Sequence, residues 1–340
     1  ILNNCSFDNK TGIWKNENIT SDVSNDVFSK FEELSTSNSS FDKIIVKPED
    51  FLFKISTPLN NYEWNDIFYD KSNNFKNFSY KGINKLSYKS KKITKYKIDK
   101  YLLYEDDNII TTDIKGNIII FSLKNKKLLT KFNFYKNQYK KINKKLNIIV
   151  NNNIIYVTDN IGYIYSFDYK KKKILWAKNV KIPLRSNLKI FNKKLIVADQ
   201  NNQLYFINTK NGDTLKLIPT EETLLKNKFI NNLSLDNETS YFLNTYGSLY
   251  SIDNRAMRIN WVFNLNKSLD LNLSNLFIGS QVINNNNRII VSTINMTYII
   301  DAITGRIIYK KNFTSTLKPI LVNNYLLTVT KKNLLIMMDV

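Results

Sequence analysis

Short stretches of alternating apolar and polar residues recur from about residue 98 to the end of the chain. Each stretch opens with Gly or Asn, and a polar residue follows six positions later. The openings are Gly116, Gly162, Asn202, Gly247, Asn295 and Asn333, and the polar residues are Ser122, Asp168, Asn208, Asp253, Asp301 and Asp339. Because apolar residues at every second position mark one face of a β-strand, each stretch is predicted to be a strand that begins after a turn.

A second short apolar run precedes every opening, and the openings are 46, 40, 45, 48 and 38 residues apart. A repeat of this length has room for about four short strands, which is the size of one propeller blade. The repeat therefore predicts an all-β chain folded as a β-propeller of four-stranded antiparallel blades. The alternative is a stack of hairpins in a β-sandwich, and the internal register shared by six copies argues against it.

Three kinds of repeat position have a predicted structural role. The opening glycines tolerate the left-handed backbone of a tight turn, and the aspartates can close the next turn by accepting hydrogen bonds from downstream backbone. A tryptophan near the start of the outermost strand can wedge its ring between neighbouring blades. These residues are Gly116, Gly162, Gly247, Asp168, Asp253, Asp301, Trp176 and Trp261.

The first part of the chain has a different composition. Residues 6 to about 43 are rich in Ser, Asn, Asp, Glu and Lys, and one helix-like spacing of apolar residues covers 26–34. Strand-like runs follow at 44–46, 51–55 and 93–98. Trp64 and Phe68 lie between these runs in a loop-like stretch.

The N-terminus has the outline of a bacterial lipoprotein cleavage site, because Leu2 lies three residues before the lone Cys5. Asn3 and Asn4 replace the small residues that normally precede such a cysteine. We therefore expect residues 1–4 to be a remnant of a lipoprotein signal peptide and 5–43 to be a flexible tether, with a short helix, that is lipid-anchored at Cys5. Residues 44–340 are expected to form the propeller, truncated at the C-terminus.

The composition excludes several kinds of chemistry. The chain has no His and one Cys, which excludes Ser-His-Asp catalysis, His-ligated metals, an intrachain disulfide and a Cys-cluster zinc site. The formal charge is +21, from 50 basic and 29 acidic residues, but only five of the basic residues are Arg. Nucleic-acid readers favour Arg, so coding bias with solvated lysines is the simpler interpretation, including for Lys170–Lys173, which is expected in a surface turn.

The strings GYIYSFDYKKKKILW at Gly162 and GSLYSIDNRAMRINW at Gly247 resemble the PQQ-like, or quinoprotein-type, repeat. Behind a lipoprotein cysteine, this repeat is similar to the BamB-type outer-membrane protein assembly lipoproteins, in the α-proteobacterial style, over roughly residues 44–340. The resemblance implies seven to eight blades and a non-enzymatic scaffold without metal or cofactor. It also implies a place on the periplasmic face of the outer membrane and a role in outer-membrane protein assembly.

The same resemblance implies the partners. In that family the propeller docks on a POTRA domain of the barrel assembly protein, and unfolded outer-membrane proteins are candidate clients. Leu184 and Arg185 in KIPLRS match part of the family's docking loop, and the connection containing Asn231 replaces its acidic positions. Nucleic acid is not expected as a partner.

Two other functions remain open on sequence grounds. A polyanion-binding propeller, for nucleic acid or an anionic membrane surface, would explain the charge. A degenerate quinone-dependent dehydrogenase uses the same propeller, but such enzymes usually carry a vicinal disulfide and long insertions, and this chain has one Cys.

Overall fold

The computed structural model describes two short strands near the N-terminus and most of the chain from residue 56 onward. The described residues are 5–8, 13–16, 56–60, 63–80, 85–86, 88–135, 137–222, 229–266, 277–285, 287–294, 296–313, 315, 317–330 and 333–340. The expected helix at 26–34, the strand-like runs at 44–46 and 51–55, and the opening Asn295 lie outside these residues.

The chain divides into two units, Ile1–Ile44 and Ile45–Val340. In the first unit, β1 (Cys5–Asp8) pairs antiparallel with β2 (Ile13–Asn16), and Cys5 lies opposite Asn16. The second unit contains all the other described strands.

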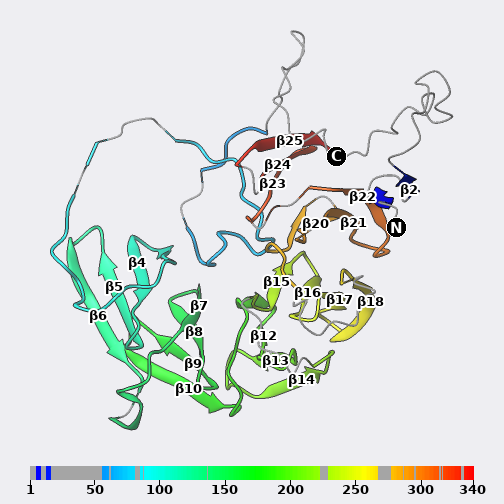
Figure 1. Cartoon of the computed structure of the whole chain (residues 1–340). Coiled ribbons are helices and arrows are strands. Elements are labelled where there is room, and N and C mark those ends of the chain that lie inside the picture. The colour runs from blue at the N-terminus through cyan, green and yellow to red at the C-terminus, as the bar shows by residue number, and fades with distance from the viewer. Residues whose placement is uncertain are drawn as a thin grey trace. The chain divides into compact units, whose positions relative to one another are not determined.

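Five four-stranded antiparallel sheets and one three-stranded sheet follow one another in chain order in the described part of the second unit (Figure 1). The first two are β3 (Leu103–Glu105), β4 (Asn108–Thr112), β5 (Asn117–Ser122), β6 (Lys127–Asn133), then β7 (Leu146–Asn151), β8 (Ile154–Asp159), β9 (Tyr163–Asp168), β10 (Lys173–Asn179). The next two are β11 (Lys189–Phe191), β12 (Lys194–Ala198), β13 (Leu204–Asn208), β14 (Thr214–Ile218), then β15 (Asn232–Leu235), β16 (Thr239–Leu243), β17 (Ser248–Asp253), β18 (Arg258–Asn264). The last two are β19 (Ile283–Asn285), β20 (Arg288–Ser292), β21 (Thr297–Asp301), β22 (Ile307–Lys311), then β23 (Ile320–Val322), β24 (Tyr325–Val329), β25 (Leu335–Asp339).

The first strand of each sheet is the innermost one, because β3 contacts β7, β11 contacts β15 and β15 contacts β19. The fourth strands, β6, β10, β14, β18 and β22, are the outer strands. A short 3₁₀ helix, η3 (Asn137–Tyr139), lies in the connection between β6 and β7. The chain is therefore a β-propeller of four-stranded blades, and the five predicted openings that fall within the described residues each lie just before a third strand.

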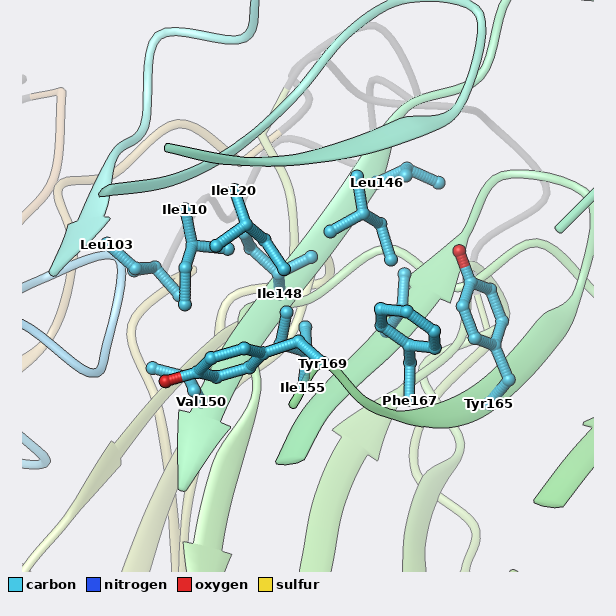
Figure 2. Packing of buried hydrophobic residues seen from close by; sticks show 12 residues of the cluster. Leu103, Ile110, Ile120, Leu146, Ile148, Val150, Ile155, Tyr165, Phe167 and Tyr169 are labelled. Carbon is cyan, nitrogen blue, oxygen red and sulfur yellow. The ribbon is translucent and has the colours of Figure 1, made fainter. Parts of the chain in front are cut away.

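The hydrophobic core lies between successive blades. One cluster joins Leu103, Ile110 and Ile120 of the first blade to Ile148 and Ile155 of the second (Figure 2). Four further clusters repeat this arrangement between the later blades. Each blade thus needs its neighbours to bury its two faces, as expected for a repeat architecture.

The repeat glycines and aspartates lie in the turns of the blades. Gly116, Gly162 and Gly247 have φ values of 80°, 108° and 96°, in the left-handed region that other residues adopt at a cost. The aspartates accept hydrogen bonds from backbone N–H groups of the turn that follows. Those aspartates are Asp168, Asp253 and Asp301.

Trp176 and Trp261 each pack on the next blade. Trp176 Nε1 donates to Thr209 O at 2.8 Å, and a Cβ added to Gly212 would lie 2.5 Å from the Trp176 ring. Trp261 Nε1 donates to Ala302 O at 3.2 Å, and its ring lies in the same way against Gly305. Both rings therefore lie between neighbouring blades.

Every outer strand contains a β-bulge at the same place, opposite the third strand of its blade. The register shifts fall between Ile120 and Phe121, Ile174 and Trp176, Phe206 and Ile207, Ser251 and Ile252, and Ile299 and Ile300. A bulge twists an edge strand and weakens its ability to pair with another strand.

The predicted strand at 93–98 was wrong. Only Ile98 forms an isolated bridge, to Asp113, and the rest of this stretch has no strand partner in the described part of the chain. This stretch instead packs on the turn between β4 and β5. Thr94 Oγ1 donates to Asp113 Oδ2 at 2.9 Å, and Ile114 N donates to Lys97 O at 3.1 Å.

Candidate functional site

The centre of the propeller contains a segment of the chain itself. Residues 63–75, which we call the axial segment, contact the inner strand of every described blade. Trp64 N donates to Tyr104 O at 2.8 Å, Val150 N donates to Asn65 O at 3.0 Å, and Leu235 N donates to Lys71 O at 2.8 Å. The other inner strands are bound by side chains or carbonyl groups of the same segment. Asp66 binds β11, the carbonyl group of Ser72 binds β19, and Asn74 binds β23.

Two asparagines fasten the axial segment to distant strands. Asn73 Nδ2 donates to Leu233 O and Val282 O, both at 2.8 Å. Asn74 Nδ2 donates to Leu321 O at 2.8 Å, and Asn74 Oδ1 accepts from Leu321 N at 3.0 Å. Amide side chains suit this role because each offers both donors and an acceptor to open strand edges.

A buried ion pair holds the axial segment to β11. Lys189 Nζ lies 2.6 Å from Asp66 Oδ2, and the two side chains are 1% and 7% exposed. Lys189 Nζ also donates to Asn73 Oδ1 at 2.6 Å and to Asp70 O at 3.2 Å, so all three of its donors are used. Burial lowers the pKa of Lys189, and the negative charge of Asp66 opposes that shift.

A second lysine approaches the axial segment from the connection before β23. Lys318 Nζ donates to Asn73 O at 3.0 Å and lies over the rings of Phe68 and Tyr69, 5.6 and 5.2 Å from their centroids. Burial lowers the pKa of Lys318 to about 8, and repulsion from Lys189 adds to the shift.

A cavity of about 540 Å³ lies between the axial segment and the inner strands β7 and β11. Asp66, Tyr69 and Asp70 border it on one side, and Ile149 and Ile190 border it on the other. Burial raises the pKa of Asp70, but its hydrogen bond with Lys76 and that from Ser72 N bring it below the usual range. Four of the charged groups that line the cavity are paired with one another, since Asp66 binds Lys189 and Asp70 binds Lys76, both at 2.6 Å.

The described residues do not assemble a metal site, because no group of three or more His, Cys, Asp or Glu side chains among them could hold an ion. Nor does any helix in the described part of the chain have the length and apolar character needed to span a bilayer.

The predicted docking loop is rigidly held between two blades. Leu184 N donates to Asp159 O and Arg185 N donates to Ala198 O, both at 3.0 Å. Ser186 forms a parallel bridge with Asn231, and Ser186 Oγ accepts from Ala198 N at 2.8 Å. These contacts fix the backbone of Arg185.

The structure brings the three predicted partner-binding residues together around Asp199. Leu184 pairs with Asp199 in an isolated bridge, and Asn231 Nδ2 donates to Asp199 O at 2.6 Å. However, Leu184 and Asn231 are buried, at 2% and 0% exposure, whereas Arg185 is half-buried. Of the three, only Arg185 has side-chain surface to offer a partner.

A repeated residue in the turns at this end of the blades was not predicted. Asp113, Asp159 and Asp199 each accept backbone N–H bonds from the turn that contains the opening Gly or Asn. Burial raises the pKa of Asp199, and its hydrogen bonds oppose the shift. The signal is visible in the sequence, since an Asp or Asn stands three residues before four of the openings.

Acidic side chains also occur in the next connection, at positions that sequence reasoning did not single out. Glu221 accepts from Asn244 Nδ2 and Ser248 Oγ, both at 3.0 Å, and also from Tyr250 OH. Burial raises the pKa of Glu221, but these hydrogen bonds hold it below its usual range. Glu222, beside it, is exposed. The connections that carry Arg185 and Glu222 both run from an outer to an inner strand, so they lie at the same end of the blades.

Solved structures with this architecture are only distantly related in sequence. BamB from Moraxella catarrhalis matches with a TM-score of 0.58 and 13% identity, over 70% of this chain and 71% of that chain. The computationally designed Ika8 protein matches with a TM-score of 0.56 and 9% identity, over 70% of each chain. Sqt1 from Saccharomyces cerevisiae matches with a TM-score of 0.53 and 13% identity, over 69% of each chain. At these identities the similarity shows the fold alone.

The sequence comparison is more specific. No curated protein matches the chain. A family model described as outer membrane protein assembly factor BamB matches residues 115–340, which span the blades from the first opening glycine onward. The predicted PQQ-like repeat is therefore confirmed, and the chain belongs to the BamB family of outer membrane protein assembly factors.

Proposed function

We propose that this chain is a non-enzymatic scaffold of the outer-membrane β-barrel assembly machinery and that it docks on a POTRA domain of the barrel assembly protein. Membership of the BamB family supports the assembly role. The observation that carries the docking site is the loop at Arg185, whose backbone is hydrogen-bonded to two blades while its side chain reaches the surface. A guanidinium can bind a carboxylate with both of its arms, and a fixed backbone presents the Arg185 side chain from one position.

Exposed Glu222 lies at the same end of the blades and adds a negative charge to this surface. A partner that offers a carboxylate to Arg185 and a basic group to Glu222 would fit the pattern. Because Leu184 and Asn231 are buried, their part is to position the loop rather than to touch the partner.

The occupied axis supports a scaffold rather than a quinone-dependent enzyme. The axial segment takes the central position, and its polar groups bind the inner strands of the blades. We further propose that the protein stands on the periplasmic face of the outer membrane, with a lipid anchor on Cys5. Mass spectrometry of the native N-terminus tests the anchor, and an unmodified Cys5 in the mature protein would contradict it.

Arg185→Ala tests the docking site. We expect this variant to lose most of its recovery of the barrel assembly protein in a pull-down, and Arg185→Lys to restore little of it, because lysine cannot bind a carboxylate with two parallel hydrogen bonds. Arg306→Ala is the matched control, since Arg306 is exposed on a turn at the opposite end of the blades. Wild-type recovery by a folded Arg185→Ala variant would refute the site.

A further inference from the structure

The outer strands carry only positive charge. Two Lys lie in each of β6, β10 and β22, one Lys in β14 and one Arg in β18, and none of these five strands contains Asp or Glu. Acidic residues of the same blades lie on the first three strands, for example Glu105 on β3, Asp159 on β8 and Asp168 on β9. Basic residues occur on both inner and outer strands, whereas acidic residues are missing from the five outer strands, and coding bias alone would not produce that difference.

Large aliphatic side chains stand between these lysines on β10 and β14. Leu175, Leu215 and Leu217 are 43%, 42% and 40% exposed. Leu175 and Leu215 are the extra residues of the two bulges, so neither has a partner opposite it on the third strand. The extra leucine of each of these two bulges thus lies outside the ladder and at the surface.

These two strands form one surface. Lys178 of β10 donates from Nζ to Thr214 Oγ1 of β14 at 2.7 Å, and Trp176 packs on Gly212 just before β14. Lys172, in the turn before β10, adds a further exposed charge. We call this surface the leucine–lysine rim; its residues are Lys172, Lys173, Leu175, Lys178, Leu215, Lys216 and Leu217.

We propose that the leucine–lysine rim binds the surface of an anionic lipid bilayer. Lysines on long apolar stems beside exposed leucines suit a membrane interface, where the leucines leave water and the ammonium groups reach phosphate headgroups. Protein interfaces are depleted in Lys and enriched in Tyr, Trp and Arg, and nucleic-acid surfaces favour Arg and stacking rings. The bulges also disfavour the pairing of another β-strand with this rim.

The proposal does not depend on the docking site at Arg185. It adds a second contact, with lipid headgroups, to a protein that we place beside a membrane. The probe is therefore vesicle binding by the full chain produced without acylation, so that a lipid on Cys5 makes no contribution.

Binding is measured by co-sedimentation with phosphatidylcholine vesicles with and without phosphatidylglycerol. We expect binding only when phosphatidylglycerol is present, with weakening as salt is raised. Replacing Lys172, Lys173 and Lys216 by Gln should weaken it about 100-fold, because each lysine near an anionic surface contributes about fivefold. Leu175→Ser with Leu217→Ser, which keeps the charge, should weaken it about tenfold.

The matched control replaces Lys140, Lys141 and Lys145 by Gln. These exposed lysines lie in the connection between β6 and β7, so the control removes the same net charge away from the rim. Equal losses in the two triple variants would overturn the proposal, as would binding that does not require phosphatidylglycerol. The proposal would also be overturned if the chain bound a DNA duplex more tightly than the phosphatidylglycerol vesicles and the rim variant lost that binding. That result would assign the surface to nucleic acid.

Discussion

The buried ion pair between Lys189 and Asp66 offers a direct test of whether the axial segment is an integral part of the propeller. Lys189→Met keeps the length of the side chain but removes its charge and its three hydrogen bonds. The change leaves the Asp66 carboxylate buried without a cation and leaves Asn73 Oδ1 without this donor. Removing one partner of a buried pair costs about 3–5 kcal/mol of folding free energy.

The partner substitution gives the other half of a double-mutant cycle. Asp66→Asn should also destabilise the fold, because it leaves the Lys189 ammonium buried beside a neutral amide. Combining the two changes removes both charges, so the double variant should be more stable than the sum of the single losses predicts, by about 2–3 kcal/mol. Urea denaturation of the four proteins, followed by circular dichroism, measures this coupling.

Lys76→Met is the matched control, because it breaks a pair of the same length with Asp70 of the same segment. Lys76 is 57% exposed, whereas Lys189 is 1% exposed, and exposed pairs contribute less than about 1 kcal/mol. Limited proteolysis at Lys71, which both variants keep, reports on release of the axial segment, and we expect faster cleavage there in Lys189→Met than in Lys76→Met. Single losses that add to within about 0.5 kcal/mol would refute the reasoning, since they would show that the two charges do not interact.

Two further predictions concern the wedge between blades and the second axial lysine. Gly212→Ala should lower the free energy of unfolding by about 2–4 kcal/mol, because the added Cβ would lie 2.5 Å from the Trp176 ring and the backbone φ is 80°. Thermal melts should show that Gly212→Ala destabilises the Trp176→Ala variant less than it destabilises the wild type. Equal losses in the two backgrounds would contradict the clash. Because the pKa of Lys318 falls from 10.5 to about 8, the folded chain binds fewer protons than the unfolded chain between those values, so this residue should make stability rise with pH there. In urea melts at pH 8 and above, Lys318→Gln should flatten the rise of stability with pH, whereas the control Lys310→Gln, at an exposed position, should leave it unchanged. An unaltered rise in Lys318→Gln would contradict a lowered pKa of Lys318 as its cause.

Much of the blade architecture could be predicted because its signals are local. An apolar run, a left-handed turn at Gly162 and a turn-closing Asp168 interact with residues only a few positions away, so each leaves a regular trace in the sequence. The position of Trp176 was readable for the same reason, since it recurs at Trp261 in the same register. The prediction of a strand at 93–98 failed because alternation gives the period of a strand but does not supply a neighbouring strand to pair with.

The candidate site was only partly predictable, because burial depends on which distant segments meet. Arg185 could be singled out from its rarity and its motif, but the burial of Leu184 and Asn231 follows from their contacts with the turn at Asp199. The paired lysines and leucines of the rim are visible in the sequence, yet only the bulges and the contact between Lys178 and Thr214 turn them into one surface.

The sequence by itself determined the repeat, the type of blade and the family, since these depend on periodicity and on turn residues. The tertiary structure decided what occupies the axis. Asp66 and Lys189 are 123 residues apart, and Asn74 and Leu321 are 247 residues apart. Contacts over such separations cannot be predicted from a local sequence pattern. The physical reason is that a ring of blades leaves the inner strand edges unpaired at its centre, and the Asn- and Asp-rich stretch at 63–75 supplies the hydrogen bonds that those edges would otherwise lack.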